Sequence, residues 1–114
     1  MNIEPETNKK IQELQILEQN LQNLIMQKQS VQIELNESLN ALEELKISDD
    51  EVYKVLGGIM IKADKNKLLN ELNEKKKILD LRISSIEKQE KIIEGKTDLL
   101  RREINEDISK NIKK

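Results

Sequence analysis

The fold of this chain is decided by residues 52–63, which read VYKVLGGIMIKA. Two short runs of apolar and β-branched residues flank the pair Gly57-Gly58. Tight hairpin turns need positive φ angles, which glycine adopts without steric cost, so the pattern predicts a β-hairpin. With the glycines in the turn, the expected cross-strand pairs are Leu56 with Ile59, Lys54 with Ile61, and Val52 with Ala63.

The predicted hairpin is apolar on both faces. One face would carry a single charge, Lys54, and the other would carry Tyr53, Val55, Met60 and Lys62. A hairpin with one face in water should alternate apolar and polar residues, and an isolated two-stranded hairpin is marginally stable at best. The sequence predicts no other strand, so we expect another subunit to cover this hairpin.

The residues before the hairpin predict a long helix over about 6–46. Pro5 suits its first turn, and no glycine or proline follows until the hairpin. Apolar residues recur at a spacing of three and four, which is typical of a coiled coil. Eight of the ten positions of this seam are apolar, and the other two are Lys28 and Ser38. The ten positions are Leu14, Leu17, Leu21, Leu24, Lys28, Val31, Leu35, Ser38, Leu42 and Leu45.

A second helix is predicted over about 65–112, with Asp64 as its N-cap. Its seam has the same spacing: Leu69, Leu72, Lys76, Leu79, Ile83, Ile86, Glu90, Ile93, Thr97, Leu100 and Ile104. After Ile104 the apolar spacing changes to four, through Ile108 and Ile112. Gly95 interrupts the helix on its expected solvent face, which is either tolerated drift or a functional flexible point.

Together these elements predict a mostly α fold: a long antiparallel two-helix coiled coil joined by a single β-hairpin, forming one domain over residues 1–114. Folding back at the hairpin places Ser38 beside Lys76 and Lys28 about one turn from Glu90. We expect the polar seam residues to pair and to help set the register of the helices.

Composition excludes several classes of function. The 20 basic and 22 acidic residues are interspersed, and Tyr53 is the one aromatic residue, so we expect no nucleic-acid partner. There is no histidine or cysteine and no phosphate-binding loop, which argues against an enzyme, a metal site or a cofactor. No apolar run is long enough for a signal peptide or a membrane span, so we expect a cytoplasmic protein without a membrane partner.

A second candidate site lies at the two ends of the chain. Apolar residues there should lie together at the end of the coiled coil farthest from the hairpin, where exposed apolar surface would mark a binding site. Packing between frayed helix ends is the alternative. The residues of this predicted binding site are Ile3, Ile11, Leu14, Ile16, Leu99, Ile104, Ile108 and Ile112.

The residues around the hairpin resemble the β subunits of the prefoldin family. The likeness is carried by DDEVYKVLG at 49–57, IMIK at 59–62, Glu71-Leu72, LDLRI at 79–83 and IEKQE at 86–90. The resemblance implies a hetero-hexamer of two α and four β subunits, in which the hairpins assemble into β-barrels shared between subunits. The implied oligomerisation residues are Val52, Tyr53, Val55, Leu56, Ile59, Met60 and Ile61.

The resemblance further implies an ATP-independent chaperone that binds non-native proteins through its coiled-coil tips, prevents their aggregation and passes them to a group II chaperonin. The alternative is a structural coiled-coil tether, or oligomerisation module, without client binding. A tether would be expected to have a plain loop between its helices and closed tips.

Overall fold

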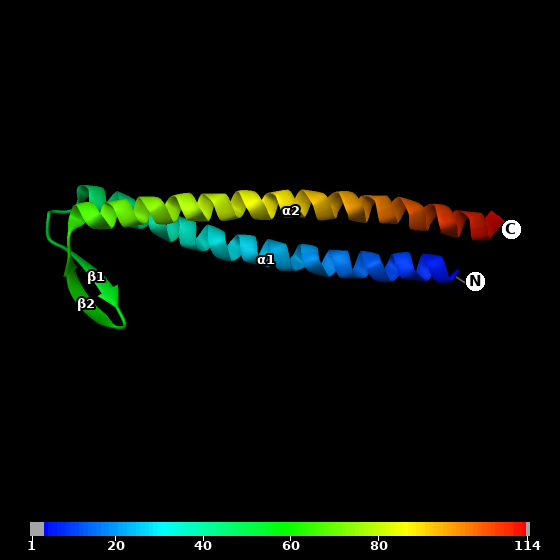
Figure 1. Ribbon diagram of the computed structural model, residues 1–114, viewed down its shortest axis with the longest axis horizontal. Coiled ribbons are helices and arrows are strands. Elements are labelled where there is room, and N and C mark those ends of the chain that lie inside the picture. The colour runs from blue at the N-terminus through cyan, green and yellow to red at the C-terminus, as the bar shows by residue number, and fades with distance from the viewer. Residues whose placement is uncertain (1–3, 114) are drawn as a thin grey trace. The chain divides into compact units, whose positions relative to one another are not determined.

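The structure is a computed structural model that describes residues 4–113. Helix α1 (Pro5–Ile47) is followed by strands β1 (Val52–Leu56) and β2 (Ile59–Ala63) and by helix α2 (Lys65–Lys113) (Figure 1). The mostly α fold with one hairpin between two long helices is therefore confirmed. Contacts within the chain divide it into a hairpin unit, Gln29–Ser84, and a terminal unit, Met1–Lys28 with Ser85–Lys114.

The hairpin has the predicted register. Gly57 and Gly58 have φ angles of 56° and 79°, as a tight turn between twisted strands requires. The antiparallel pairs are Val52 with Ala63, Tyr53 with Lys62, Lys54 with Ile61, Val55 with Met60, and Leu56 with Ile59. Alternation along each strand therefore leaves both faces largely apolar, as the sequence predicted.

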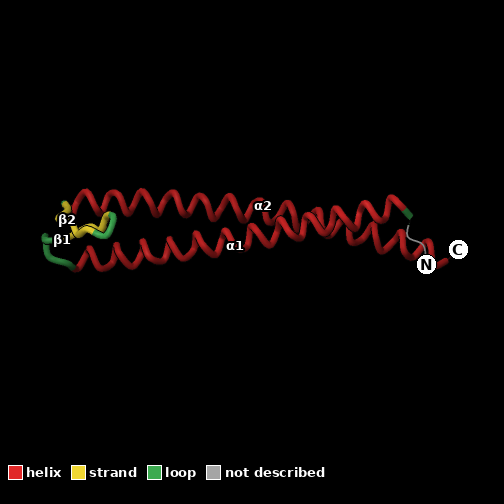
Figure 2. Tube along the Cα trace, turned by 90° about the horizontal axis from the view of Figure 1, so that it is seen from below, coloured by secondary structure: helices red, strands yellow, loops and turns green. Residues whose placement is uncertain are grey.

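Side-chain hydrogen bonds end α1 and begin α2. The Ser48 hydroxyl donates to the Leu45 carbonyl oxygen at 2.9 Å, and the Lys65 ammonium donates to the Ser48 carbonyl oxygen at 2.7 Å. Oδ1 of Asp64 accepts from the backbone N–H groups of Asn66 and Lys67 at 2.9 and 3.4 Å, so Asp64 is the N-cap as predicted. These contacts fix the points where the chain enters and leaves the hairpin. Figure 2 shows the two strands of the hairpin in yellow and the loops in green.

The core of the hairpin unit follows the predicted seam. Its buried apolar residues are Leu35, Leu42, Leu45, Val52 and Leu79. Ser38 is also buried, but its hydroxyl donates to the Glu34 carbonyl oxygen of its own helix at 3.0 Å. Among the described residues no hydrogen bond joins Ser38 to Lys76, so that predicted pairing is wrong. The reason is that a serine hydroxyl in a helix reaches the carbonyl one turn back more easily than a neighbouring helix.

The terminal unit combines an apolar seam with polar residues. Leu24, Ile86, Leu100 and Ile104 are buried, as are Thr7, Glu90 and Thr97. The Thr97 hydroxyl donates to the Glu94 carbonyl oxygen at 2.9 Å, whereas Glu90 pairs with Lys28 across the helices at 2.9 Å. Thr7 near the start of α1 likewise contacts Asp107 near the end of α2, so the helices are antiparallel here. Neither described helix is apolar enough over a sufficient length to cross a membrane.

Candidate functional site

Exposed apolar side chains of the hairpin unit gather on the hairpin. Six of its apolar side chains, on both faces, are between 46% and 69% exposed. We call these six residues the hairpin surface: Tyr53, Val55, Leu56, Ile59, Met60 and Ile61. Six of the seven residues predicted for oligomerisation thus lie in the open, where a partner could reach them. Large exposed apolar patches of this kind mark interaction sites.

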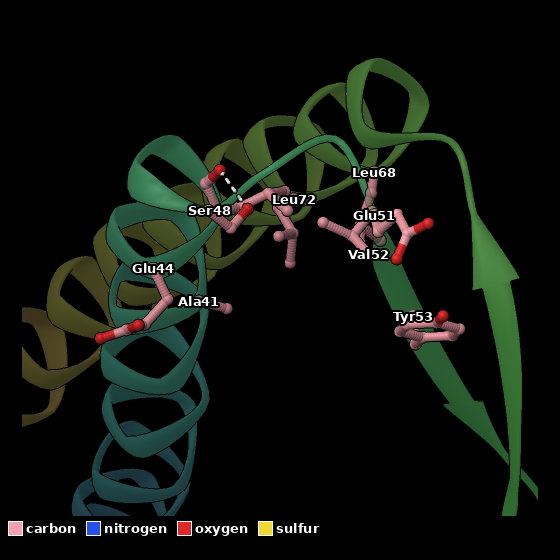
Figure 3. A pocket seen from close by; sticks show the side chains of 9 residues that line it. Ala41, Glu44, Ser48, Glu51, Val52, Tyr53, Leu68 and Leu72 are labelled. Atoms are coloured by element: carbon pink, nitrogen blue, oxygen red, sulfur yellow. Dashed lines mark hydrogen bonds between the residues drawn. The ribbon is translucent and has the colours of Figure 1, made fainter.

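Val52, the seventh predicted oligomerisation residue, has a different environment. It is 7% exposed and lines a pocket of about 360 Å³ together with Leu45, Tyr53, Leu68 and Leu72. Figure 3 shows the Val52 side chain directed from β1 toward the helices. Within this chain Val52 therefore anchors the hairpin to α1 and α2, and its predicted role in assembly stays a prediction.

A salt bridge adds a second link between hairpin and helix. The Lys54 ammonium lies 3.0 Å from Oε2 of Glu71 on α2. Both side chains are substantially exposed, so the pair contributes little to stability.

The described sheet has two strands, and each strand pairs only with the other. One backbone edge of β1 and one of β2 therefore remain free to accept a further strand. Free edges promote pairing between chains unless they are covered or blocked. Proline is absent from the hairpin, and the charges within its strands are Lys54 and Lys62. The hairpin can thus add strands at its edges and bury side chains on its faces.

The predicted client-binding residues fall into three environments. Ile16, Leu99 and Ile112 are exposed, whereas Ile11, Leu14 and Ile108 are half-buried. Ile104 is 8% exposed and belongs to the core of the terminal unit. Ile3 lies outside the described residues. The structure brings the start of α1 and the end of α2 together, as predicted, but four of the seven described residues are turned partly or wholly inward.

The contact that joins these ends is polar and was not predicted. The Thr7 hydroxyl donates to Oδ2 of Asp107 at 3.2 Å, and the Lys10 ammonium donates to the same oxygen at 2.9 Å. Lys10 also lies 3.7 Å from Oε2 of Glu103. Thr7 is 1% exposed. We call Thr7, Lys10, Glu103 and Asp107 the polar clasp.

Charge and hydrogen bonding within the polar clasp shift two pKa values. Hydrogen bonds from Lys10 and then from Thr7, with the charges of Lys10 and Lys110, lower the pKa of Asp107 below its ordinary value. The hydrogen bond to Asp107, together with the charges of Asp107 and Glu103, raises the pKa of Lys10. Partial burial opposes both shifts without cancelling them. Both groups are therefore charged around neutral pH.

The clasp could have been found by continuing the seam through polar residues. A spacing of three and four leads back from Leu14 to Lys10 and Thr7, and forward from Ile104 to Asp107. The prediction instead followed the apolar residues Ile108 and Ile112, where the final turns were expected to leave the strict seam. Ile112 is indeed 68% exposed, but the seam itself continues through Asp107, which faces the other helix.

Gly95 lies on the exposed face of an unbroken α2. A Cβ atom added there would meet nothing within 4 Å. Close packing therefore does not require a glycine at this position. Among residues 4–113, no three or more side chains of His, Cys, Asp or Glu are grouped so that they could hold a metal ion.

Comparisons with known proteins agree on one family. Residues 8–111 match the family described as "Prefoldin subunit". The prefoldin subunit beta of Pyrococcus furiosus is 41% identical over 105 residues, which cover 90% of each chain. That of Saccharolobus islandicus is 35% identical over 108 residues, covering 93% of this chain and 86% of the relative.

A solved structure agrees with these relatives. The crystal structure of the prefoldin beta subunit from Thermococcus strain KS-1 superposes with a TM-score of 0.84 and is 36% identical. The match covers 92% of this chain and 94% of that one.

Proposed function

Because the chain belongs to the prefoldin subunit family, we propose that it is a β-type subunit of an ATP-independent chaperone that acts in the cytoplasm. The complex would bind non-native proteins, keep them from aggregating and pass them to a group II chaperonin. The observation that carries this proposal is the hairpin surface, because two exposed apolar faces with free strand edges require partners.

The first part of the proposal concerns assembly. Two α and four β subunits would join through their hairpins to form shared β-barrels. A neighbouring strand would pair with the free edges, and the residues of the hairpin surface would be buried between chains. Full burial of one isoleucine or methionine side chain stabilises an interface by about 1.5–3 kcal/mol. Burial of this surface therefore supplies a strong drive to assemble.

The second part concerns clients. Ile16, Leu99 and Ile112 present exposed apolar side chains on the terminal unit. A single small patch binds an unfolded chain weakly, but several patches in one complex raise the overall affinity through effective concentration. This mechanism contains no catalytic step and uses no nucleotide. Release would follow when the chaperonin competes for the client.

One observation favours the alternative, a structural tether. The polar clasp closes the helix ends, and closed ends are expected of a tether. The hairpin surface argues the other way, because a tether needs only a loop between its helices. We therefore place the chaperone first.

Suppression of client aggregation tests the proposal. A guanidinium-unfolded enzyme is diluted into buffer without ATP, and light scattering is followed with and without the assembled complex. The complex should suppress the scattering. A triple substitution of the exposed terminal residues, Ile16→Asp, Leu99→Asp and Ile112→Asp, should remove most of this effect while leaving assembly intact.

A matched control comes from the hairpin unit. Leu81 on α2 is 71% exposed, as apolar as the residues substituted, and lies outside the terminal unit. Leu81→Asp should suppress scattering as well as the unaltered chain does. Equal loss with Leu81→Asp would contradict the assignment of clients to the helix ends. No suppression by the unaltered complex would favour the tether.

A further inference from the structure

The polar clasp lies within one helical turn of two apolar seam residues at the helix ends. Ile104 lies one turn before Asp107 on α2, and Leu14 lies one turn after Lys10 on α1. Ile104 is buried and Leu14 is half-buried. Both stay covered while the helix ends are held together. Separation of the ends would therefore expose apolar surface beyond that of Ile16, Leu99 and Ile112.

We propose that the polar clasp is an autoinhibitory contact: closed, it withholds Ile104 and Leu14 from clients, and its opening adds them to the binding surface. This inference rests on the proposed client binding. It goes beyond it by stating that the same helix ends have a closed, weakly binding form and an open, strongly binding one.

The position of the clasp suits such a contact. Helix ends are the least stable part of a coiled coil, because they have neighbours on one side only. At this end the seam contains Thr7, Lys10 and Asp107 where apolar side chains would give firmer packing. Polar contacts shared with water are weaker than an apolar seam. The clasp therefore closes the ends while leaving them easy to open.

Two substitutions open the clasp by opposite changes of charge. Asp107→Lys places a second cation beside Lys10 and removes the acceptor of the Thr7 hydroxyl. Lys10→Glu places a third carboxylate beside Glu103 and Asp107. An effect shared by both variants cannot come from attraction between the added charge and the client. Asp107→Leu is the counterpart, since it replaces the clasp by an apolar seam contact and keeps the ends closed.

The experiment has two readouts on the assembled complex. Hydrogen exchange measures opening of the backbone amides of residues 8–14 and 104–112. Fluorescence anisotropy measures binding of reduced, carboxymethylated α-lactalbumin, a client that stays unfolded. Asp107→Lys and Lys10→Glu should each speed the exchange roughly tenfold, as loss of a charged hydrogen bond predicts, and tighten client binding several-fold. Asp107→Leu should do neither.

Arg101→Gln is the matched control. It breaks an ion pair across the same helices, Arg101 with Glu18 at 2.8 Å, but both side chains of this pair are about half exposed and neither belongs to the predicted seam. Its exchange and client affinity should equal those of the unaltered chain. Unchanged hydrogen exchange in both Asp107→Lys and Lys10→Glu would show that the clasp does not hold the helix ends together. Faster exchange without tighter binding would overturn its inhibitory role. A complete lack of client binding by every chain would overturn the proposed function itself, and this inference with it.

Discussion

The Lys28 ammonium lies 2.9 Å from Oε1 of Glu90, inside the seam of the terminal unit between α1 and α2. The Glu90 side chain is 11% exposed, and the buried residues Leu24 and Ile86 lie one turn away on either helix. The distance is that of a hydrogen bond, although its direction falls short of a well-formed one. The Glu90 carboxylate, by hydrogen bonding and by charge, raises the pKa of Lys28. Such a pair favours the one register that brings the two groups together.

This ion pair should behave as a unit in a double-mutant cycle. Lys28→Met leaves the covered Glu90 carboxylate without its cation and should lower the melting temperature by several degrees. Lys28→Met with Glu90→Leu should recover most of that loss, because an apolar pair suits the seam. Thermal unfolding followed by circular dichroism, with every variant at the same protein concentration, measures these melting temperatures. The cycle also needs Glu90→Leu alone. If the effects of Lys28→Met and Glu90→Leu simply add in the double variant, the two residues are not coupled.

The same glycine-to-alanine change should have opposite effects at two positions. Gly58 has a φ of 79°, where a Cβ atom is strained, so Gly58→Ala should destabilise the hairpin by about 1–2 kcal/mol. Gly95 lies within α2 with open space around it, so Gly95→Ala should stabilise the helix by about 1 kcal/mol. Thermal unfolding compares the stability of each variant with that of the unaltered chain. If both substitutions changed the stability in the same direction, the strained turn at Gly58 would be contradicted.

The hairpin surface should control assembly. Ile61→Asp places a carboxylate on an apolar face that a partner would bury, and the proposed hexamer should dissociate. Ile47→Asp is the control, because Ile47 is more exposed than Ile61 but lies at the end of α1 outside the hairpin. Native mass spectrometry with an α subunit reports the assembly. A normal hexamer with Ile61→Asp would refute the role of the hairpin.

The polar clasp should give the helix ends a defined pH dependence. The pKa of Asp107 is lowered from 3.8, so its contribution to stability is present above that value and is lost as the pH falls through the folded pKa. The pKa of Lys10 is raised from 10.5, so its contribution is present below that value and is lost as the pH rises through the folded pKa.

NMR titration of the Asp107 carboxyl carbon measures the first of these effects. Its pKa should lie below the ordinary value and should rise in Lys10→Met and in Thr7→Val, since each removes a hydrogen bond to the carboxylate. Lys110, the remaining cation facing Asp107, is unchanged in both variants. An Asp107 pKa unaffected by either change would show that the clasp does not form.

The N-cap of α2 should make a measurable contribution. Asp64→Ala removes the acceptor for the Asn66 and Lys67 N–H groups and should destabilise the chain by about 1 kcal/mol. Asp64→Asn, which keeps a capping oxygen, should recover most of that loss. Chemical denaturation measures the free energy of unfolding of the unaltered chain and of both variants. Equal stability of the alanine and asparagine variants would argue against capping.

Most of the fold could be predicted because it depends on local and periodic features. The pair Gly57-Gly58 defines the turn, and side chains alternate strictly along a strand, so the register of the hairpin followed directly. The helical seams were predicted from their spacing of three and four, and the pairing of Lys28 with Glu90 followed from the antiparallel return of the chain.

The candidate site was predicted only in part. Apolar residues near the chain ends could be found in the sequence, but their exposure depends on which side of each helix meets the other. Ile104 is buried and Ile112 is exposed, although both are isoleucines near the end of the same helix. The clasp was missed because a search for apolar spacing passes over Thr7, Lys10 and Asp107.

The hairpin, the two helices and the residues of their seams follow from local sequence, since turn chemistry and periodicity act between near neighbours in the chain. What those elements cover follows from how the helices pack. Val52 is buried against the helices while Tyr53 beside it is open, and Asp107 meets residues some hundred positions away. Burial and ion pairing between distant residues depend on how the helices are rotated and aligned, and no local pattern specifies that alone.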